Sequence, residues 1–136
     1  MIFADVYYPR DTISVPSFFR LPRQFSYVPE LYKLSSDAKL IYAIMLDRLC
    51  ISFENGWFDE TGRVYIYYTL DEVQRELNCS RTKSKRVLTE LEKSGLIERH
   101  AQGQGKPSRT YVRQIVDVEN SVENALERLR SLSLPV

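Results

Sequence analysis

Apolar residues first recur at helical spacing over a long stretch, from Leu34 to Phe53. The members of this stripe predict the broad apolar face of a central core helix: Leu40, Ile41, Ile44, Met45, Leu49 and Phe53. A hydroxyl cap and an acidic first turn at Ser35–Asp37 mark its start, and the breaker pair Asn55–Gly56 marks its end.

The pattern then changes to that of a strand followed by a short helix. Arg63–Tyr68 is β-branched and aromatic, which predicts a strand, and residues 59–62 before it are typical of a turn. Thr69 and Glu72 stand at the spacing of a capping box, so we expect a helix to begin there. Its single apolar face consists of Leu70, Val73 and Leu77.

A second short helix follows after only Asn78–Cys79. Ser80 is a good N-cap and Gly95 a good stop, because the residue after a helix often adopts a left-handed conformation. A narrow inward stripe is predicted from Ser84, Val87, Leu88 and Leu91. Two capped helices joined by a tight turn predict a helix-turn-helix.

The outward face of this second helix is basic and rich in hydroxyls. At about 100° per residue it presents Thr82, Arg86, Thr89 and Lys93, with Lys83 and Lys85 on its flanks. Such a face suits the major groove of DNA, although the same pattern taken alone also fits an ordinary solvated helix.

A strand, a glycine-rich tip and a second strand come next. Leu96–His100 and Arg109–Val116 predict a β-hairpin around residues 101–108, and we expect Lys106 and Arg109 at its tip. A basic hairpin directly after a basic second helix predicts an α+β fold, a winged helix-turn-helix with a two-stranded wing.

The two ends of the chain are read separately from this domain, which we assign to residues 18–116. Residues 1–17 predict an irregular N-terminal arm, and 117–136 an added C-terminal helix whose apolar stripe fits either its own domain or a second subunit. In Phe18–Phe25, the aromatic side chains are expected to pack on the domain, with phosphate contacts by Arg20 and Arg23 as the alternative.

Charge is divided unevenly along the chain, although its net charge is only +1. Residues 78–113 hold nine basic and three acidic side chains, or +6, and the remainder holds ten basic and fifteen acidic ones, or −5. A contiguous positive segment attracts a polyanion to one face of the protein.

Several classes of protein do not fit the sequence. No apolar run approaches the roughly 20 residues of a membrane span, no secretory signal is visible, and Cys50 and Cys79 are expected to be reduced thiols in a cytoplasmic protein. The lone His100 has no nucleophile at a recognisable spacing, and no phosphate-binding glycine motif is present. We therefore expect no catalysis, no cofactor and no metal site.

Several blocks of the sequence resemble one known family. They are Phe18–Pro22, Leu34–Leu40, Leu46–Arg48, Asn55–Trp57, Gly62–Ile66, Asn78–Ser80, Glu90–Arg99, Gly103–Pro107 and Tyr111–Val112. In order and spacing these blocks are similar to the N-terminal domain of RepA_N-type replication initiators of plasmids and mobile elements from low-GC Gram-positive bacteria. Residues 1–16 are longer than the lead expected for this family, and 117–136 lie beyond the similar blocks.

The resemblance implies a domain that binds double-stranded DNA at repeated sites (iterons) in a replication origin, usually as a homodimer. It also implies that host replication factors bind a C-terminal domain that this chain does not contain. The rival readings are a winged-helix transcriptional regulator and a protein-interaction module, with Tyr65, Tyr67 and Tyr111 or the C-terminal stripe as its contact surface.

Within the basic face we expect distinct roles for individual side chains. Arg86 suits a guanine edge, whereas Lys83, Lys85 and Lys93 suit phosphates, and Ser80 leaves early helix amides near a phosphate. Lys106 and Arg109 would contact the backbone or the minor groove. The full set of expected DNA contacts is Ser80, Arg81, Thr82, Lys83, Lys85, Arg86, Thr89, Lys93, Lys106 and Arg109.

Overall fold

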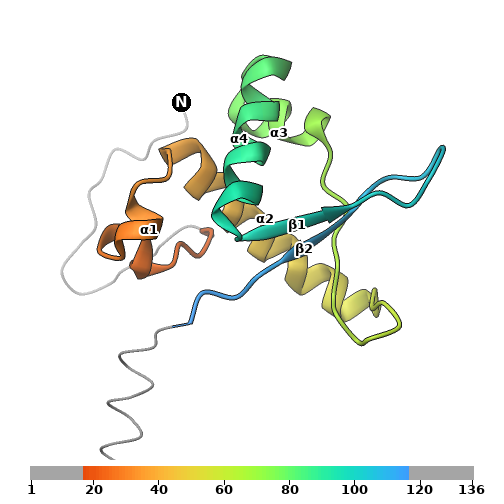
Figure 1. The fold of residues 1–136 in the computed structure, drawn as a ribbon. Helices are drawn as coiled ribbons and strands as arrows, with labels where there is room; N and C mark the ends of the chain where they lie inside the picture. The colour runs from red at the N-terminus through yellow and green to blue at the C-terminus, as the bar shows by residue number, and fades with distance from the viewer. Residues whose placement is uncertain (1–16, 117–136) are drawn as a thin grey trace, which may run out of the picture.

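The computed structural model describes residues 17–116, in which a group of helices packs against a small antiparallel sheet (Figure 1). The elements, in chain order, are η1 (Arg23–Ser26), α1 (Pro29–Tyr32), α2 (Ser36–Asn55), α3 (Leu70–Leu77), α4 (Arg81–Ser94), β1 (Ile97–His100) and β2 (Arg109–Val112). The long helix α2 runs behind the sheet and α4, and the wing projects to one side (Figure 1). None of the helices within these described residues is both long and apolar enough to span a bilayer.

Helix α2 has the predicted bounds but a different buried face. The Ser35 side chain accepts a hydrogen bond from the Ala38 amide, and Gly56 ends the helix in the left-handed conformation, with φ of 74°. Leu40 and Phe53, predicted to be core residues, are 41% and 63% exposed. Tyr42 is buried instead, because its hydroxyl donates to the Arg113 carbonyl at 2.6 Å and so stays hydrogen-bonded away from water.

The helix-turn-helix forms as predicted. Thr69 and Glu72 make both bonds of the capping box at the start of α3, and Asn78 ends that helix with φ of 49°. The Ser80 side chain caps α4 by accepting from the Lys83 amide, and Gly95 ends α4 in the left-handed conformation. The predicted inward stripe of α4 is buried in full: Ser84, Val87, Leu88 and Leu91.

One hydrophobic core joins α2, α3, α4 and β1. Its buried members are Phe25, Ala38, Ile41, Tyr42, Ile44, Met45, Ile66, Tyr68, Val73, Val87, Leu88, Leu91, Leu96 and Ile97. The apolar side of α4 is therefore fixed against α2 and the wing, and its opposite side is left to solvent.

The wing is a two-stranded antiparallel sheet in which Ile97 pairs with Val112 and His100 with Arg109. The prediction of a strand over Arg63–Tyr68 is wrong. This segment makes only two isolated bridges, Val64 with Phe58 and Ile66 with Thr110. Its amides are divided between two neighbours: Tyr65 donates to the Trp57 carbonyl, and Ile66 and Thr110 exchange two bonds of 2.9 and 2.8 Å. No continuous ladder can form along it.

The segment before α2 contains two short turns that the sequence pattern did not indicate, η1 and α1. Phe25 of η1 is buried, and its ring meets that of Tyr42 edge-on at 5.5 Å. The predicted packing of this segment on the domain is thus confirmed for Phe25, whereas Phe18, Phe19 and Leu21 are exposed. The predicted arm, apart from residue 17, and the predicted C-terminal helix lie outside the described residues.

Candidate nucleic-acid interface

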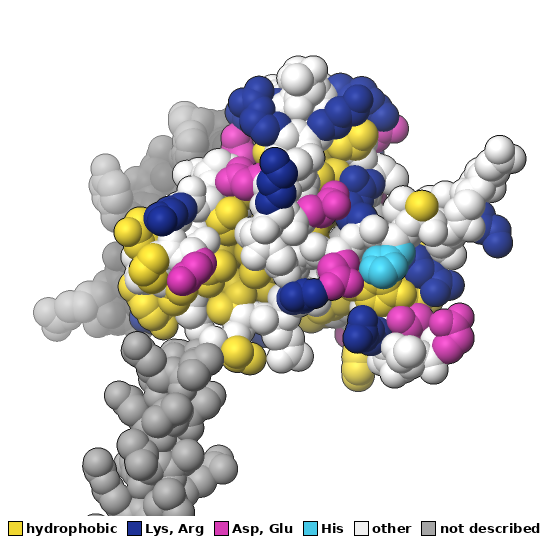
Figure 2. Space-filling view, in the orientation of Figure 1, with side chains coloured by type: hydrophobic (Ala, Val, Ile, Leu, Met, Phe, Trp, Pro, Cys, Tyr) yellow, Lys and Arg dark blue, Asp and Glu magenta, His cyan; other side chains and the backbone are white. Residues whose placement is uncertain are grey.

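The outward face of α4 carries exposed basic and hydroxyl side chains. Burial of the inward stripe turns the remaining side chains to solvent, and exposed positions include Thr82, Lys85, Arg86, Thr89 and Lys93. Lys and Arg side chains gather around the upper end of α3 and α4, and lower on this face single basic side chains lie among acidic ones (Figure 2). We call this set of five residues the α4 face.

Three cations of the α4 face are uncommitted. Lys85, Arg86 and Lys93 make no side-chain hydrogen bond or ion pair with any other residue between 17 and 116. Their charges are not neutralised within that part of the chain, so they are available to an external anion.

One flank of α4 is attached to the start of α2. Lys83 Nζ lies 3.0 Å from Asp37 Oδ2. The Glu90 carboxylate accepts from both the amide and the hydroxyl of Ser35, each at 2.7 Å. Lys83, predicted as a groove or phosphate contact, is half-exposed in this ion pair between helices, and its contact with DNA stays a prediction.

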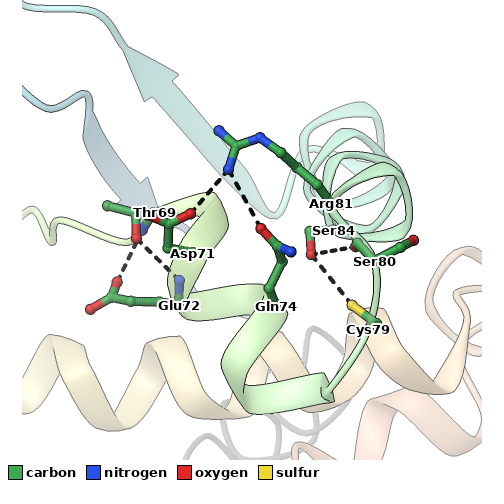
Figure 3. A network of polar contacts seen from close by, with 8 residues as sticks. All are labelled: Thr69, Asp71, Glu72, Gln74, Cys79, Ser80, Arg81 and Ser84. Atoms are coloured by element: carbon green, nitrogen blue, oxygen red, sulfur yellow. Dashed lines mark hydrogen bonds and ion pairs between the residues drawn. The ribbon is translucent and has the colours of Figure 1, made fainter.

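The other flank of α4 is attached to α3 and the wing. Arg81 Nη1 lies 3.0 Å from Asp71 and 3.4 Å from the Gln74 side chain, both on α3 (Figure 3). Glu92 faces Arg99 of β1 at 3.7 Å. No local pattern in the sequence signals these pairs, since each joins separate elements.

The two basic residues predicted at the wing tip lie in different places. Lys106 is exposed in the turn, where its amide donates to the Gly103 carbonyl. Arg109 begins β2 opposite His100, and its guanidinium carbon lies 4.4 Å from the centre of the Tyr65 ring. Arg109 therefore lies directly after the turn, at the end of the two-stranded sheet nearest the tip, where its guanidinium stacks on Tyr65.

Aromatic rings gather beside Arg109, and we call them the tyrosine cluster. Tyr65 meets Tyr67 at 5.5 Å and Tyr111 at 6.2 Å between ring centres, and Trp57 meets Tyr67 at 5.8 Å. The three tyrosines of the protein-interaction reading therefore do lie together. They are half-buried against one another and beside Arg109, and this arrangement braces the wing against the Trp57 segment.

The turn before the tyrosine cluster is organised by Asp59. Its Oδ1 accepts from the Thr61 hydroxyl and from the amides of Thr61 and Arg63, and its Oδ2 accepts from the Tyr111 hydroxyl at 2.9 Å. These bonds, that from the Thr61 side chain first, hold the pKa of the Asp59 carboxyl well below its ordinary value.

The Asp59 bonds predict an acid-sensitive contribution to stability. Because the folded-state pKa lies below the unfolded value of about 3.9, the contribution is complete above roughly pH 4 and is lost as the pH falls towards the folded pKa. Thermal melting of wild type and Asp59→Asn between pH 7 and pH 2 should show a difference that shrinks in acid. Glu60→Gln, in the same exposed turn, corrects for net charge; an Asp59→Asn difference that stays constant to pH 2 contradicts the assignment.

Comparison with known proteins gives a family. Residues 17–125 match RepA_N, the family described as Replication initiator protein A (RepA) N-terminus, and this match spans most of the chain. The chain belongs to the RepA_N family. The sequence resemblance is thus confirmed, and so is the winged-helix fold.

A curated relative of the chain is a protein of Lactobacillus helveticus described as "41 kDa protein". It is 30% identical over 113 residues, which are 79% of this chain and 32% of the relative. The chain therefore spans about a third of the length of that curated relative.

Three solved structures share the fold. One described as "N-Terminal domain of DNA binding protein" has a TM-score of 0.68 at 29% identity and covers 88% of this chain and 90% of its own. One described as "Structure of Rep-DNA complex" has a TM-score of 0.67 at 29% identity over 88% and 92%. One described as "Structure of MDR initiator" has a TM-score of 0.64 at 31% identity over 82% and 88%.

Proposed function

We propose that this RepA_N chain is the DNA-binding part of a replication initiator, and that it binds repeated sites in the origin of a plasmid or mobile element in the bacterial cytoplasm. The observation that carries the proposal is the α4 face, an exposed row of hydroxyls and uncommitted cations on the second helix of a helix-turn-helix. Membership of the family and the likeness to a Rep–DNA complex support it.

Within the α4 face, Arg86 would read a guanine and Lys85 and Lys93 would hold phosphates. Lys106 of the wing tip would reach the backbone or the minor groove. Ser80, Lys83 and Arg109 then act mainly by positioning, because each is engaged in a cap, an ion pair or a stack. Arg81 is paired with Asp71 and keeps further donors for a phosphate. This division of roles needs no catalysis and no cofactor in the chain.

The arrangement beyond the winged helix is also proposed. Residues 18–116 would form the binding unit, 1–17 an arm, and 117–136 a helix for pairing of two copies or for connection to a further domain. Homodimerisation would match the repeated sites. Host replication factors would bind the part of the initiator that corresponds to the remaining two thirds of the Lactobacillus helveticus relative.

The test is fluorescence anisotropy with origin DNA of the parent replicon and with scrambled DNA, across a salt series. We expect tighter binding to the origin DNA. If four phosphates are contacted, the affinity should fall about 100-fold between 50 and 200 mM salt. Equal binding to both DNAs, or an affinity that does not change with salt, would contradict the proposal.

The protein-interaction reading retains one specific observation in its favour. Trp57, Phe58 and Phe53 are exposed beside the tyrosine cluster. Binding of a protein through these rings would survive moderate salt, unlike binding through phosphates. A transcriptional regulator would bind DNA equally well, so replication of a minimal origin plasmid supplied with the whole initiator separates that alternative.

A further inference from the structure

A cavity of about 160 Å³ lies where the helix-turn-helix meets the wing. Its walls are the start of α3 from Thr69 to Asp71, Arg81 of α4, Arg99 of β1 and Ser108 just before β2. We call it the α3–wing cavity. It is below the roughly 300–1,000 Å³ of small-molecule sites, so it suits one small polar group.

Two arginines from different elements line this cavity. Arg81 donates from Nη1 to the side chains of Asp71 and Gln74, and its other guanidinium N–H groups remain as donors (Figure 3). Arg99 has only the 3.7 Å approach to Glu92, and its Nε is buried with no hydrogen-bond acceptor among the described residues. The fork of donors on a guanidinium matches the oxygens of a phosphate.

Tyr68, another residue of the lining, also carries a buried polar atom without a partner within residues 17–116. Tyr68 is only 2% exposed, it lines the cavity, and its hydroxyl has no partner among the described residues. Buried polar groups in native proteins are nearly always hydrogen-bonded. The Tyr68 ring belongs to the hydrophobic core and lies under the Arg48 guanidinium of α2. The guanidinium of Arg99, with its unpartnered Nε, is therefore the polar group of the lining that lacks an acceptor in the described part of the chain.

The start of α3 adds backbone donors. The capping box occupies the amides of Thr69 and Glu72, whereas those of Leu70 and Asp71 belong to the first helical turn, which has no partners within the helix. A helix start favours an anion. Asp71 is paired with Arg81, and Glu92, the partner of Arg99 at 3.7 Å, is not among the lining residues, so two arginines and one carboxylate line the cavity.

We infer that the α3–wing cavity holds one backbone phosphate of the DNA that lies across the α4 face. This inference rests on the proposed function and adds Arg99 and Ser108, which are not in the expected set of DNA contacts, as binding residues. Since Arg81 begins α4 and Ser108 precedes β2, a phosphate held here fixes the helix and the wing in one register on the duplex.

The test combines a protein variant with neutral DNA linkages. Origin duplexes carrying a single methylphosphonate at successive positions are titrated with the full chain, as wild type and as Arg99→Gln. At one position we expect wild type to lose about tenfold in affinity, and Arg99→Gln, already weakened on unmodified DNA, to lose nothing further. Arg113→Gln, at an exposed arginine paired with Glu98 outside the cavity, should keep the full loss.

Additive losses at every position would overturn the inference. Melting curves establish that Arg99→Gln is folded; if it is not, Ser108→Ala takes its place in the same scan. A wild type that does not prefer origin DNA contradicts the proposed function. A titration with inorganic phosphate then decides what the cavity binds.

In this titration inorganic phosphate is added to the protein alone, and chloride at equal ionic strength is the control. NMR follows the signals of Arg99 Nε–H and of the Leu70 amide. Shifts specific to phosphate, together with the expected scan, support the inference. Shifts in a protein that binds no origin DNA identify a free-phosphate site and overturn the DNA assignment. The absence of a phosphate-specific NMR shift, together with additive affinity losses in the methylphosphonate scan, overturns the anion site.

Discussion

Replacement of Leu91 by alanine should lower the free energy of unfolding by about 2–5 kcal/mol. Leu91 is fully buried, belongs to the core cluster and lies on the side of α4 that packs on the rest of the domain. Alanine removes the apolar contact and leaves a cavity that the surrounding helices cannot fill completely. Urea unfolding followed by circular dichroism gives the value.

The matched control for Leu91→Ala is Leu40→Ala on α2. Leu40 is exposed although it belongs to the sequence stripe, so this change should stay within about 0.5 kcal/mol of wild type. A loss under 1 kcal/mol for Leu91→Ala, or equal losses for the two variants, would contradict the assignment of the core.

Replacement of Arg86 by alanine should abolish most of the preference for origin DNA over scrambled DNA. Under the proposed function, a bidentate contact to a guanine is worth about 1–3 kcal/mol of discrimination, or roughly 5- to 150-fold in the ratio of affinities. Arg86 is exposed and unpaired within residues 17–116, so stability should not change. Anisotropy titrations with both DNAs measure the ratio.

Lys93→Ala provides the contrast for Arg86→Ala. A lost phosphate contact weakens binding to both DNAs about equally and reduces the salt slope by about 1, without changing the ratio. Lys33→Ala, at an exposed lysine after α1, should leave both affinities unchanged. If Arg86→Ala behaves as Lys93→Ala does, Arg86 contacts phosphate rather than a base.

The helix-turn-helix could be predicted from the sequence because its signals are local. Thr69, Glu72, Ser80 and Gly95 act on backbone groups within a few residues of themselves, and the stripe of α4 depends only on helical spacing. The hairpin was recognisable from two strand-like runs on either side of a glycine-rich turn. The family was recognisable because several short blocks of its sequence recur here in the same order and spacing.

The failures of prediction occur where tertiary contacts decide. Tyr42 is buried because the Arg113 carbonyl, far along the chain, accepts from its hydroxyl. The stack of Arg109 on Tyr65 and the ion pair of Lys83 with Asp37 likewise join distant segments, so no local pattern indicated them. The α3–wing cavity combines four separate segments, so nothing in its individual residues could have identified it.

The attachment of both flanks of α4 has an evolutionary consequence. Glu90 on Ser35 and Arg81 on Asp71 prevent the helix from turning about its own axis. Neither attachment uses Thr82, Arg86 or Thr89. Under the proposed function, these outward positions can therefore diverge between replicons without a penalty in folding, and two plasmids of common descent can acquire separate origins, and thus coexist in one cell, through a few substitutions on an unchanged frame.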